Sequence, residues 1–117
     1  MHGRFNVVAR RKRRISDETA AVLALFLDDP GKERYGREIV IETKLKSGSL
    51  YPMLRRLENR EILVSAWEDL KGAVDEGRRP RRLYRLRGTD EARSLLLEWR
   101  AAQISSQRSR IGGTLPA

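Results

Sequence analysis

Hydrophobic and polar positions divide the chain into short periodic segments. A nearly continuous apolar run, Ala20 to Leu27, follows Ser16 and two acidic residues. Serine is a favoured helix N-cap, and acidic side chains stabilise the first turn of a helix, so this run is predicted to form a helix buried on most sides. Asp28-Asp29-Pro30-Gly31 then ends it, because proline disfavours a helical residue before it.

A second helix is predicted from about Lys32 or Glu33 to Lys44. Tyr35, Ile39 and Val40 fall on one face of such a helix. Gly36 inside a helix costs about 1 kcal/mol relative to alanine, which indicates close packing or the close approach of a ligand backbone. Residues 44–48 then form a connection of the length used in a helix-turn-helix.

The third helix carries the clearest amphipathic pattern. Its apolar side chains fall on one side of a helical wheel, and they are Leu50, Met53, Leu54 and Leu57. Tyr51, Pro52 and two arginines fall on the opposite side. Because proline lacks a backbone donor and is best tolerated in the first turn, the helix is predicted to begin near Gly48 or Ser49.

A hairpin and a last helix complete the pattern. Residues 62–68 and the alternating residues 81–86 are predicted strands, with Tyr84 and Leu86 on one face and a long polar loop, about Asp69 to Pro80, between them. Thr89 is predicted to cap the final helix. Its apolar stripe comprises Ala92, Leu95, Leu96, Trp99 and Ala102, broadened by Leu97 and Ile104.

This order of elements predicts a mainly α protein with a small β-hairpin (α+β), a winged helix-turn-helix. A length of 117 residues supports one such domain. The predicted divisions are a basic N-terminal arm (1–14), the winged helix-turn-helix (15–88), a C-terminal dimerisation helix (89–104) and a flexible tail (105–117). A last helix with this much apolar surface needs a partner, which is predicted to contact Leu95, Leu96, Trp99 and Ala102.

Composition excludes several classes of function. The chain has no cysteine and a single histidine, His2, so disulfides, cysteine-based zinc sites and histidine-based triads are excluded. No apolar run reaches the roughly 18–20 residues of a membrane span, and the N-terminus has no apolar segment of the kind found in secretory signals. We therefore expect no metal, no cofactor, no catalytic residues and no membrane contact.

The distribution of charge favours nucleic acid as the partner. Lys+Arg number 25 against 16 Asp+Glu, a net charge of +9, and the positive charge is clustered. One cluster is the arm, Arg10, Arg11, Lys12, Arg13 and Arg14. It either enters a minor groove or adds only nonspecific affinity. A second cluster, Arg78, Arg79, Arg81 and Arg82, is either a solubility patch or a contact to the DNA backbone or minor groove.

The candidate DNA contacts of the helices lie on the second and third. They are Tyr35, Lys44, Lys46, Ser47, Ser49, Tyr51, Pro52, Arg55 and Arg56. A helix whose first turn offers hydroxyls and N–H groups, followed by outward arginines, suits phosphate at its end and base edges at its side. Ser47 and Ser49 are expected to act first as caps. Arg55 and Arg56 could each contact guanine or merely hold phosphate.

Several motifs resemble the PadR family of transcriptional regulators. They are Tyr35-Gly36-Arg37-Glu38-Ile39, Gly48-Ser49-Leu50-Tyr51-Pro52-Met53-Leu54-Arg55-Arg56-Leu57-Glu58, Trp67-Glu68 and Arg81-Arg82-Leu83-Tyr84-Arg85-Leu86. The resemblance implies a prokaryotic winged-helix repressor of the smaller type with a single C-terminal helix, which binds an inverted-repeat operator as a homodimer. It also implies that the Tyr35 hydroxyl reaches a phosphate. Leu86-Arg87-Gly88-Thr89-Asp90 departs from the family pattern Leu-Thr-x-x-Gly, and Asn59-Arg60 stands where many members have glycine.

The leading hypothesis is a sequence-specific regulator of transcription that binds double-stranded DNA, expected in the cytoplasm on the nucleoid. The third helix would enter the major groove, and the wing would follow the backbone or minor groove. An architectural or RNA-binding winged-helix protein without operator specificity is the alternative, and a protein-interaction adaptor using the last helix is another. An enzyme is disfavoured because no nucleophile–base pair is evident. Trp67 and Trp99 either pack in the core or line the pocket of a small-molecule effector.

Overall fold

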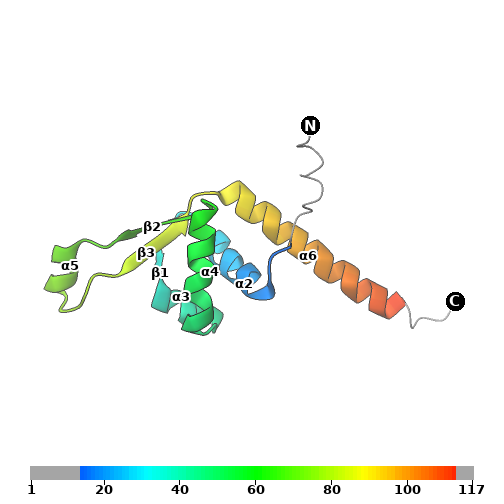
Figure 1. Cartoon of the computed structure of the whole chain (residues 1–117), viewed down its shortest axis with the longest axis horizontal. Coiled ribbons are helices and arrows are strands. Elements are labelled where there is room, and N and C mark those ends of the chain that lie inside the picture. The colour runs from blue at the N-terminus through cyan, green and yellow to red at the C-terminus, as the bar shows by residue number, and fades with distance from the viewer. Residues whose placement is uncertain (1–13, 113–117) are drawn as a thin grey trace.

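The computed structural model describes residues 14–112 and has the predicted winged helix-turn-helix architecture. Its elements in chain order are α2 (Asp17–Asp28), β1 (Arg34–Tyr35), α3 (Gly36–Thr43), α4 (Ser47–Asn59), β2 (Leu63–Trp67), α5 (Leu70–Asp75), β3 (Arg82–Leu86) and α6 (Thr89–Gly112). Figure 1 shows α2, α3 and α4 together at the centre, with the β2–β3 hairpin projecting to one side and α6 to the other. Arg10 to Arg13 of the predicted arm lie outside the described residues.

The core forms where the three central helices meet. Leu23 and Phe26 of α2, Ile39 of α3 and Leu54 of α4 are completely buried there. All four apolar residues predicted for the inner face of α4 are buried, which confirms the amphipathic pattern. The predicted cap is also confirmed, because the Ser16 side chain accepts a hydrogen bond from the Thr19 N–H. The core therefore fixes which face of α4 points outward.

The start of the second helix was predicted wrongly. Arg34 and Tyr35 form β1, which pairs antiparallel with β3 through Arg34↔Tyr84 and Tyr35↔Leu83. The sheet order is β1-β3-β2. A two-residue strand has no periodicity of its own, and only its tertiary pairing with β3 creates it. Gly36 consequently lies at the first position of α3 and not inside the helix.

The third helix begins at Ser47, slightly earlier than predicted. Pro52 therefore lies in its second turn and not its first. A proline there removes the hydrogen bond that the carbonyl of Gly48 would otherwise accept. Because Gly48 is exposed, water can take the place of that donor. The N-cap position is occupied by Lys46 without a side-chain hydrogen bond, so the prediction that Ser47 and Ser49 act as caps was wrong.

The wing is a hairpin with a short helix at its tip. β2 and β3 pair antiparallel, with Ser65 opposite Tyr84 and Trp67 opposite Arg82, and Tyr84 and Leu86 are buried as predicted. The loop predicted between the strands contains α5 instead of being wholly irregular. The Asp69 side chain accepts a hydrogen bond from the Gly72 N–H at 3.1 Å, which caps this helix. Gly77, with φ of 71°, turns the chain back towards β3.

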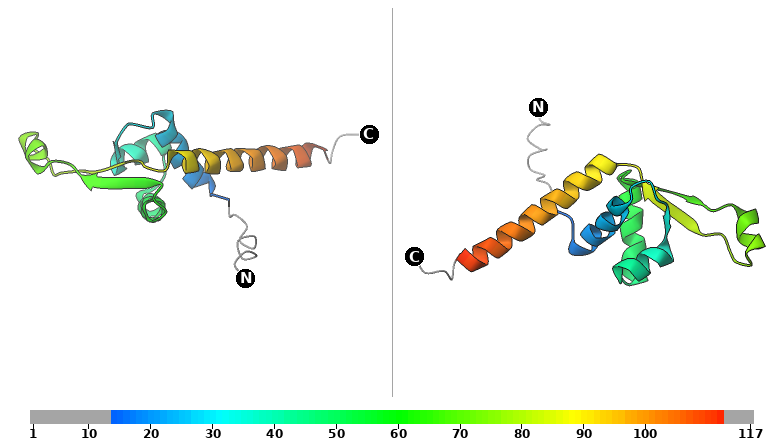
Figure 2. Two further views of the ribbon diagram at one scale, coloured as in Figure 1. Left: turned by 90° about the horizontal axis from the view of Figure 1, so that it is seen from above. Right: turned by 180° about the vertical axis from the view of Figure 1, so that it is seen from behind.

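The C-terminal helix is longer than predicted. Thr89 is its first residue and not its cap, because the carbonyl of Gly88 accepts the hydrogen bond of the Ala92 N–H at 2.9 Å. The helix continues past residue 104 to Gly112, since residues 105–111 contain neither glycine nor proline. Figure 2 shows its far half extending away from the body. Within residues 14–112, no helix is long and apolar enough to cross a membrane.

Candidate nucleic-acid interface

The turn between α3 and α4 places a row of polar side chains at the surface. Lys44 adopts the left-handed conformation, φ 64°, and ends α3. The Thr43 hydroxyl stabilises this turn by donating to the Ile39 carbonyl at 2.7 Å and accepting from the Leu45 N–H at 3.3 Å. Lys44, Lys46, Ser47 and Ser49 are all exposed as a result. Their hydroxyls and ammonium groups surround the uncapped start of α4.

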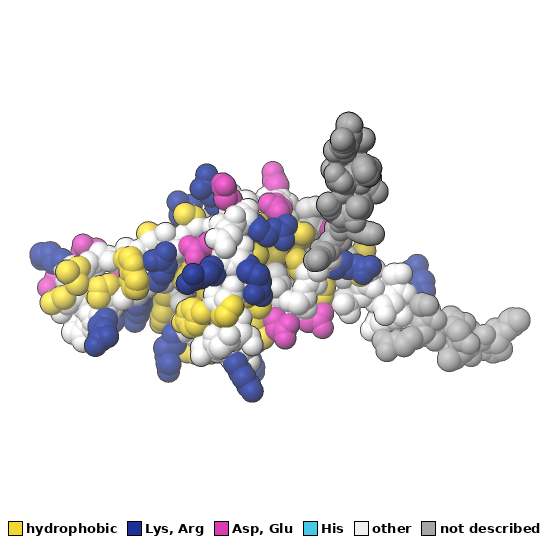
Figure 3. Space-filling model, viewed as in Figure 1, with side chains coloured by type: hydrophobic (Ala, Val, Ile, Leu, Met, Phe, Trp, Pro, Cys, Tyr) yellow, Lys and Arg dark blue, Asp and Glu magenta, His cyan; other side chains and the backbone are white. Residues whose placement is uncertain are grey.

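The outer face of α4 carries exposed cations. Arg55 and Arg56 are exposed, and neither forms an ion pair with another described residue. Pro52 lies beside them and is also exposed. Figure 3 shows Lys and Arg side chains spread over the wing and the central helices on this side of the molecule. The predicted residues of α4 and of the preceding turn are therefore all exposed.

Tyr51 is held at the base of this surface by its contact with Gly36. A β-carbon on Gly36 would lie 2.2 Å from the Tyr51 hydroxyl oxygen, so only glycine allows the ring its present position. Gly36 was predicted to allow close packing or the close approach of a ligand backbone. In the structure, the side chain that packs closely against it is Tyr51 of the same chain. Tyr51 itself is 46% exposed and remains accessible to a ligand.

We expect Gly36→Ala to separate stability from binding. The new methyl group must displace the Tyr51 ring, which is cheap for folding because the ring is at the surface. Alanine also reduces the conformational entropy of the unfolded chain relative to glycine, a stabilisation of about 0.4–1 kcal/mol. Thermal unfolding should therefore show an unchanged or raised Tm, whereas fluorescence anisotropy should show weaker DNA binding. Gly31→Ala is the control, because that position is open; a loss of binding in both variants would contradict the assignment.

A polar cluster joins α4 to the wing. The Ser65 hydroxyl donates a hydrogen bond to the Glu58 carboxylate and accepts one from Arg82 Nε at 3.0 Å. Arg82 Nη2 also lies 3.9 Å from Glu58 Oε2. Neither Glu58 nor Ser65 was predicted as a site residue, because they approach each other only when the wing folds back on α4. The cluster fixes the angle between the two elements that would contact DNA.

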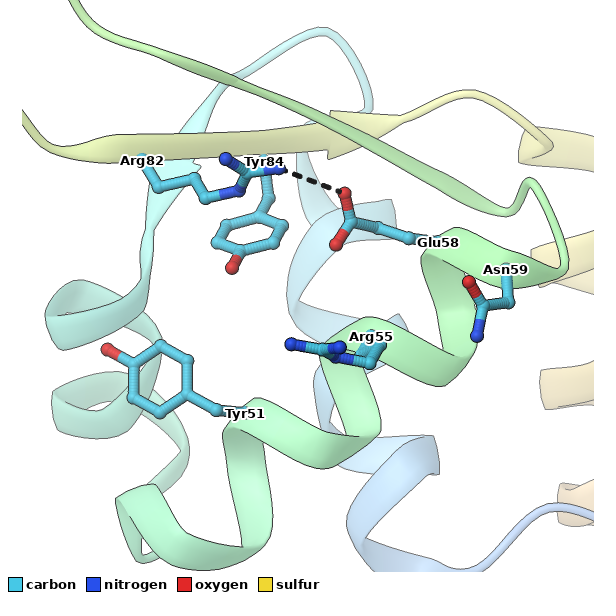
Figure 4. Close-up of a pocket in the computed structure, with 6 residues that line it drawn as sticks. All are labelled: Tyr51, Arg55, Glu58, Asn59, Arg82 and Tyr84. Atoms are coloured by element: carbon cyan, nitrogen blue, oxygen red, sulfur yellow. Dashed lines mark ion pairs between the residues drawn. The ribbon is translucent and has the colours of Figure 1, made fainter.

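A cleft separates α4 from the wing. In Figure 4, Tyr51 and Arg55 from α4 face Arg82 and Tyr84 from β3, with Glu58 and Asn59 at the far end. This part of the cleft has a volume of about 600 Å3. Burial raises the pKa of the Tyr84 hydroxyl above its ordinary value. The phenol therefore stays neutral and can act as a hydrogen-bond donor at neutral pH.

Glu68, which directly follows β2, links the two ends of the wing loop. Its carboxylate accepts hydrogen bonds from Arg78 Nη1 at 2.5 Å, from Arg78 Nη2 at 3.0 Å and from the Arg81 N–H at 2.9 Å. Arg78 Nη2 also lies 3.0 Å from Glu76 Oε1. Arg78, predicted as a DNA contact, thus has its guanidinium committed within the loop. Arg79, in contrast, is exposed, and its side chain forms no hydrogen bond or ion pair with a described residue.

Glu68 makes the stability of the wing depend on pH. The Arg78 hydrogen bonds, followed by the Arg81 N–H, lower the pKa of Glu68 from 4.5 to about 2. A carboxylate with a lowered pKa stabilises the fold fully above its unfolded pKa and loses this effect as the pH falls towards the folded value. We therefore expect Glu68→Gln to have a lower Tm than the parent at pH 7, with the difference disappearing between about pH 4.5 and 2.

Circular dichroism melts over this pH range measure that difference. Glu76→Gln is the matched control, because Glu76 contacts the same arginine from a more exposed position. A Tm difference that stays constant from pH 7 to pH 2 would show that Glu68 does not act through its charge.

Tyr35 and Arg81 form a stacked pair at the other end of the cleft. The Arg81 guanidinium carbon lies 4.1 Å from the centre of the Tyr35 ring, a cation–π distance. The Tyr35 N–H donates a hydrogen bond to Glu38 Oε1 at 3.3 Å. Glu38 Oε2 also forms an ion pair with Nη1 of the buried Arg34 at 3.7 Å. These contacts position Tyr35 half-buried beside α4.

The residues predicted for dimerisation are partly used within the chain. Leu96 is buried against the chain's own core, Leu95 packs beside it, and Trp99 Nε1 donates to Asp17 Oδ1 at 2.9 Å. Periodicity identifies an apolar stripe but not whether the same chain or a second copy covers it. Leu97 and Ile104 are large apolar residues of α6 that remain exposed in the single chain. Trp67 lies on the wing and Trp99 on α6, so the two do not line one pocket within a single chain. Trp67 is 65% exposed, which contradicts the alternative that it packs in the core.

Comparison with known proteins establishes the fold. No protein-family model and no curated protein sequence matches the chain. Solved structures do: smu.1704 from Streptococcus mutans UA159 has a TM-score of 0.61 and 22% identity, covering 90% of this chain and 97% of that one. A PadR family transcriptional regulator from Eggerthella lenta DSM 2243 has a TM-score of 0.59 and 22% identity, covering 84% and 87%. Pex from Synechococcus sp. PCC 7942 has a TM-score of 0.55 and 23% identity, covering 85% of this chain and 96% of that one. The motifs that resemble the PadR family thus lie in a chain with a PadR-like winged-helix fold.

Proposed function

We propose that this protein is a transcriptional regulator that binds double-stranded DNA sequence-specifically. The observation that carries the proposal is the outer face of α4, where Arg55 and Arg56 are exposed and free of ion pairs with described residues. Burial of Leu50, Met53, Leu54 and Leu57 holds this face outward. α4 would enter the major groove, where arginine side chains can make bidentate contacts to guanine.

The neighbouring residues would position the protein on the phosphate backbone. Lys44, Lys46, Ser47 and Ser49 surround the uncapped N-terminus of α4, a favourable place for phosphate. Tyr51 and Pro52 would contact the groove wall beside it, and the Tyr35 hydroxyl a phosphate. On the wing, Arg79, Arg81 and Arg82 would contact the backbone or minor groove, whereas Arg78 would support the loop through Glu68.

The protein would act as a homodimer on an inverted-repeat operator, as a repressor located on the nucleoid. α6 presents Leu97, Ala101 and Ile104 on one exposed side, at the spacing of successive helical turns. A groove lined in part by Ala24, Leu27 and Leu97 runs between α2 and α6. A second copy of α6 would cover this apolar surface. Two-fold symmetry would then place the two α4 helices about 34–36 Å apart, one turn of DNA.

The experiment that tests this function is anisotropy on labelled DNA from directly upstream of the gene. A scrambled duplex of equal length and a structured RNA serve as competitors, in about 150 mM salt, where nonspecific binding is weak. Tight binding to the upstream duplex alone supports an operator-specific regulator. Equal, salt-sensitive binding to every duplex and to RNA would instead favour an architectural or RNA-binding protein.

A further inference from the structure

The aromatic end of the cleft has a lining that duplex recognition by α4 does not require. Four rings, those of Tyr35, Tyr51, Trp67 and Tyr84, meet around a hollow of about 460 Å3. Sites for small molecules typically occupy about 300–1,000 Å3 and have mainly apolar walls with a few polar groups. The hollow is thus large enough for one planar molecule and has rings on several sides.

Two of these rings form flat platforms with arginine. The Arg82 guanidinium carbon lies 5.3 Å from the centre of the Trp67 ring, and Arg81 stacks on Tyr35. Trp67 is nevertheless 65% exposed, so one face of its indole remains available to a ligand. Aromatic rings and guanidinium planes are the surfaces on which unstacked nucleobases bind.

The charge of this end of the cleft selects an anion. Arg37, Arg81 and Arg82 line it, and no acidic residue does. Within residues 14–112, the guanidinium groups of Arg37 and Arg81 form no ion pair. Glu58, which lines the adjoining part of the cleft, is bound to Ser65 and Arg82, and Glu68, which accepts from the Arg81 N–H, is paired with Arg78. A ligand that fits both features carries a planar ring and a negative group close together.

We propose that this cleft binds a single unstacked nucleotide. The base stacks on the free face of Trp67 and on Tyr51, and the phosphate pairs with Arg37 and Arg81. The same chemistry is found in a free mononucleotide and in an unpaired nucleotide of a DNA strand. This activity goes beyond the proposed duplex binding, but it uses Tyr51 of α4 and Arg81 of the wing, which are also proposed duplex contacts, so duplex and nucleotide compete.

The fluorescence of Trp67 itself reports nucleotide binding to the cleft. In a Trp99→Phe background Trp67 is the sole tryptophan, and its fluorescence is followed during titration with 5′-dTMP and with the oligonucleotide (dT)8. Saturable quenching by either ligand is expected, since stacking on a base quenches indole emission. Quenching by dTMP alone identifies a free nucleotide as the ligand, and stronger quenching by (dT)8 identifies an unpaired strand. No quenching by either at about 1 mM, the weak limit of specific binding, would overturn the proposal.

Two variants separate this site from duplex binding. Trp67→Ala is expected to weaken (dT)8 binding about tenfold, with duplex affinity changed less than twofold. Leu70→Ala removes a similarly exposed apolar side chain of the wing outside the cleft and should leave both affinities unchanged. Equal weakening of (dT)8 binding in both variants would overturn the proposal. Because duplex binding is measured in parallel, failure of the cleft and failure of the regulator function give different results.

Discussion

Replacing Arg55 and Arg56 together by alanine is expected to lower the affinity for the operator at least about 100-fold. Both guanidinium groups are exposed and unpaired with described residues, so they require no internal rearrangement to reach DNA. A good arginine contact to a base edge is worth about 1–3 kcal/mol, and 1.4 kcal/mol corresponds to a factor of ten in affinity. If the arginines instead contact phosphates, each substitution should reduce the slope of log K against the logarithm of the salt concentration by about 0.9.

Anisotropy titrations from about 50 to 200 mM salt separate these two roles. Loss of discrimination against a mutated operator indicates base contacts, whereas uniform weakening with a smaller salt slope indicates phosphate contacts. Arg87→Ala with Arg108→Ala is the control, because it removes the same charge from exposed positions outside α4 and breaks only one exposed ion pair, that of Arg87 with Glu61. Similar affinities for the two double variants would mean that only net charge matters, and the architectural alternative would then be preferred.

Local periodicity predicted the parts of the fold in which each residue's environment follows from its near neighbours. The inner face of α4 and the burial of Tyr84 and Leu86 are examples, because helix and strand geometry alone place these side chains on one face. The Ser16 cap is another, since its hydrogen bond spans three residues. The same local reasoning placed Arg55 and Arg56 on the outside of α4.

Features that depend on contacts between distant segments were not predictable in this way. β1 exists only because Arg34 and Tyr35 pair with β3. The Glu58–Ser65–Arg82 cluster joins three elements, and Glu68 recruits Arg78 from across the loop. Charge alone therefore predicted Arg78 and Arg82 only as a solubility patch or as DNA contacts of the wing. Charge counting identifies a basic wing, but the pairing of each arginine decides which of them can reach DNA.

Placing aspartate at Leu97 and Ile104 is expected to give a monomer whose operator affinity falls about 100-fold. The two side chains are 62% and 55% exposed in the single chain, so the substitutions should leave its own core intact. In the dimer, they would place unpaired carboxylates in an apolar interface, which costs several kcal/mol. A monomer also loses the gain in affinity that comes from linking two half-site contacts, typically 10²–10⁴-fold.

Leu70→Asp with Val74→Asp is the matched control for this prediction. These residues of α5 are 62% and 59% exposed, so the control adds the same charge at similarly exposed apolar positions on the wing. Sedimentation equilibrium should show a dimer for the control and a monomer for the α6 variant. If both remain dimeric, a surface other than the Leu97–Ile104 side of α6 joins the copies. If the α6 variant is monomeric but binds the operator as tightly as the parent, each half-site is recognised independently and the inverted-repeat arrangement is wrong.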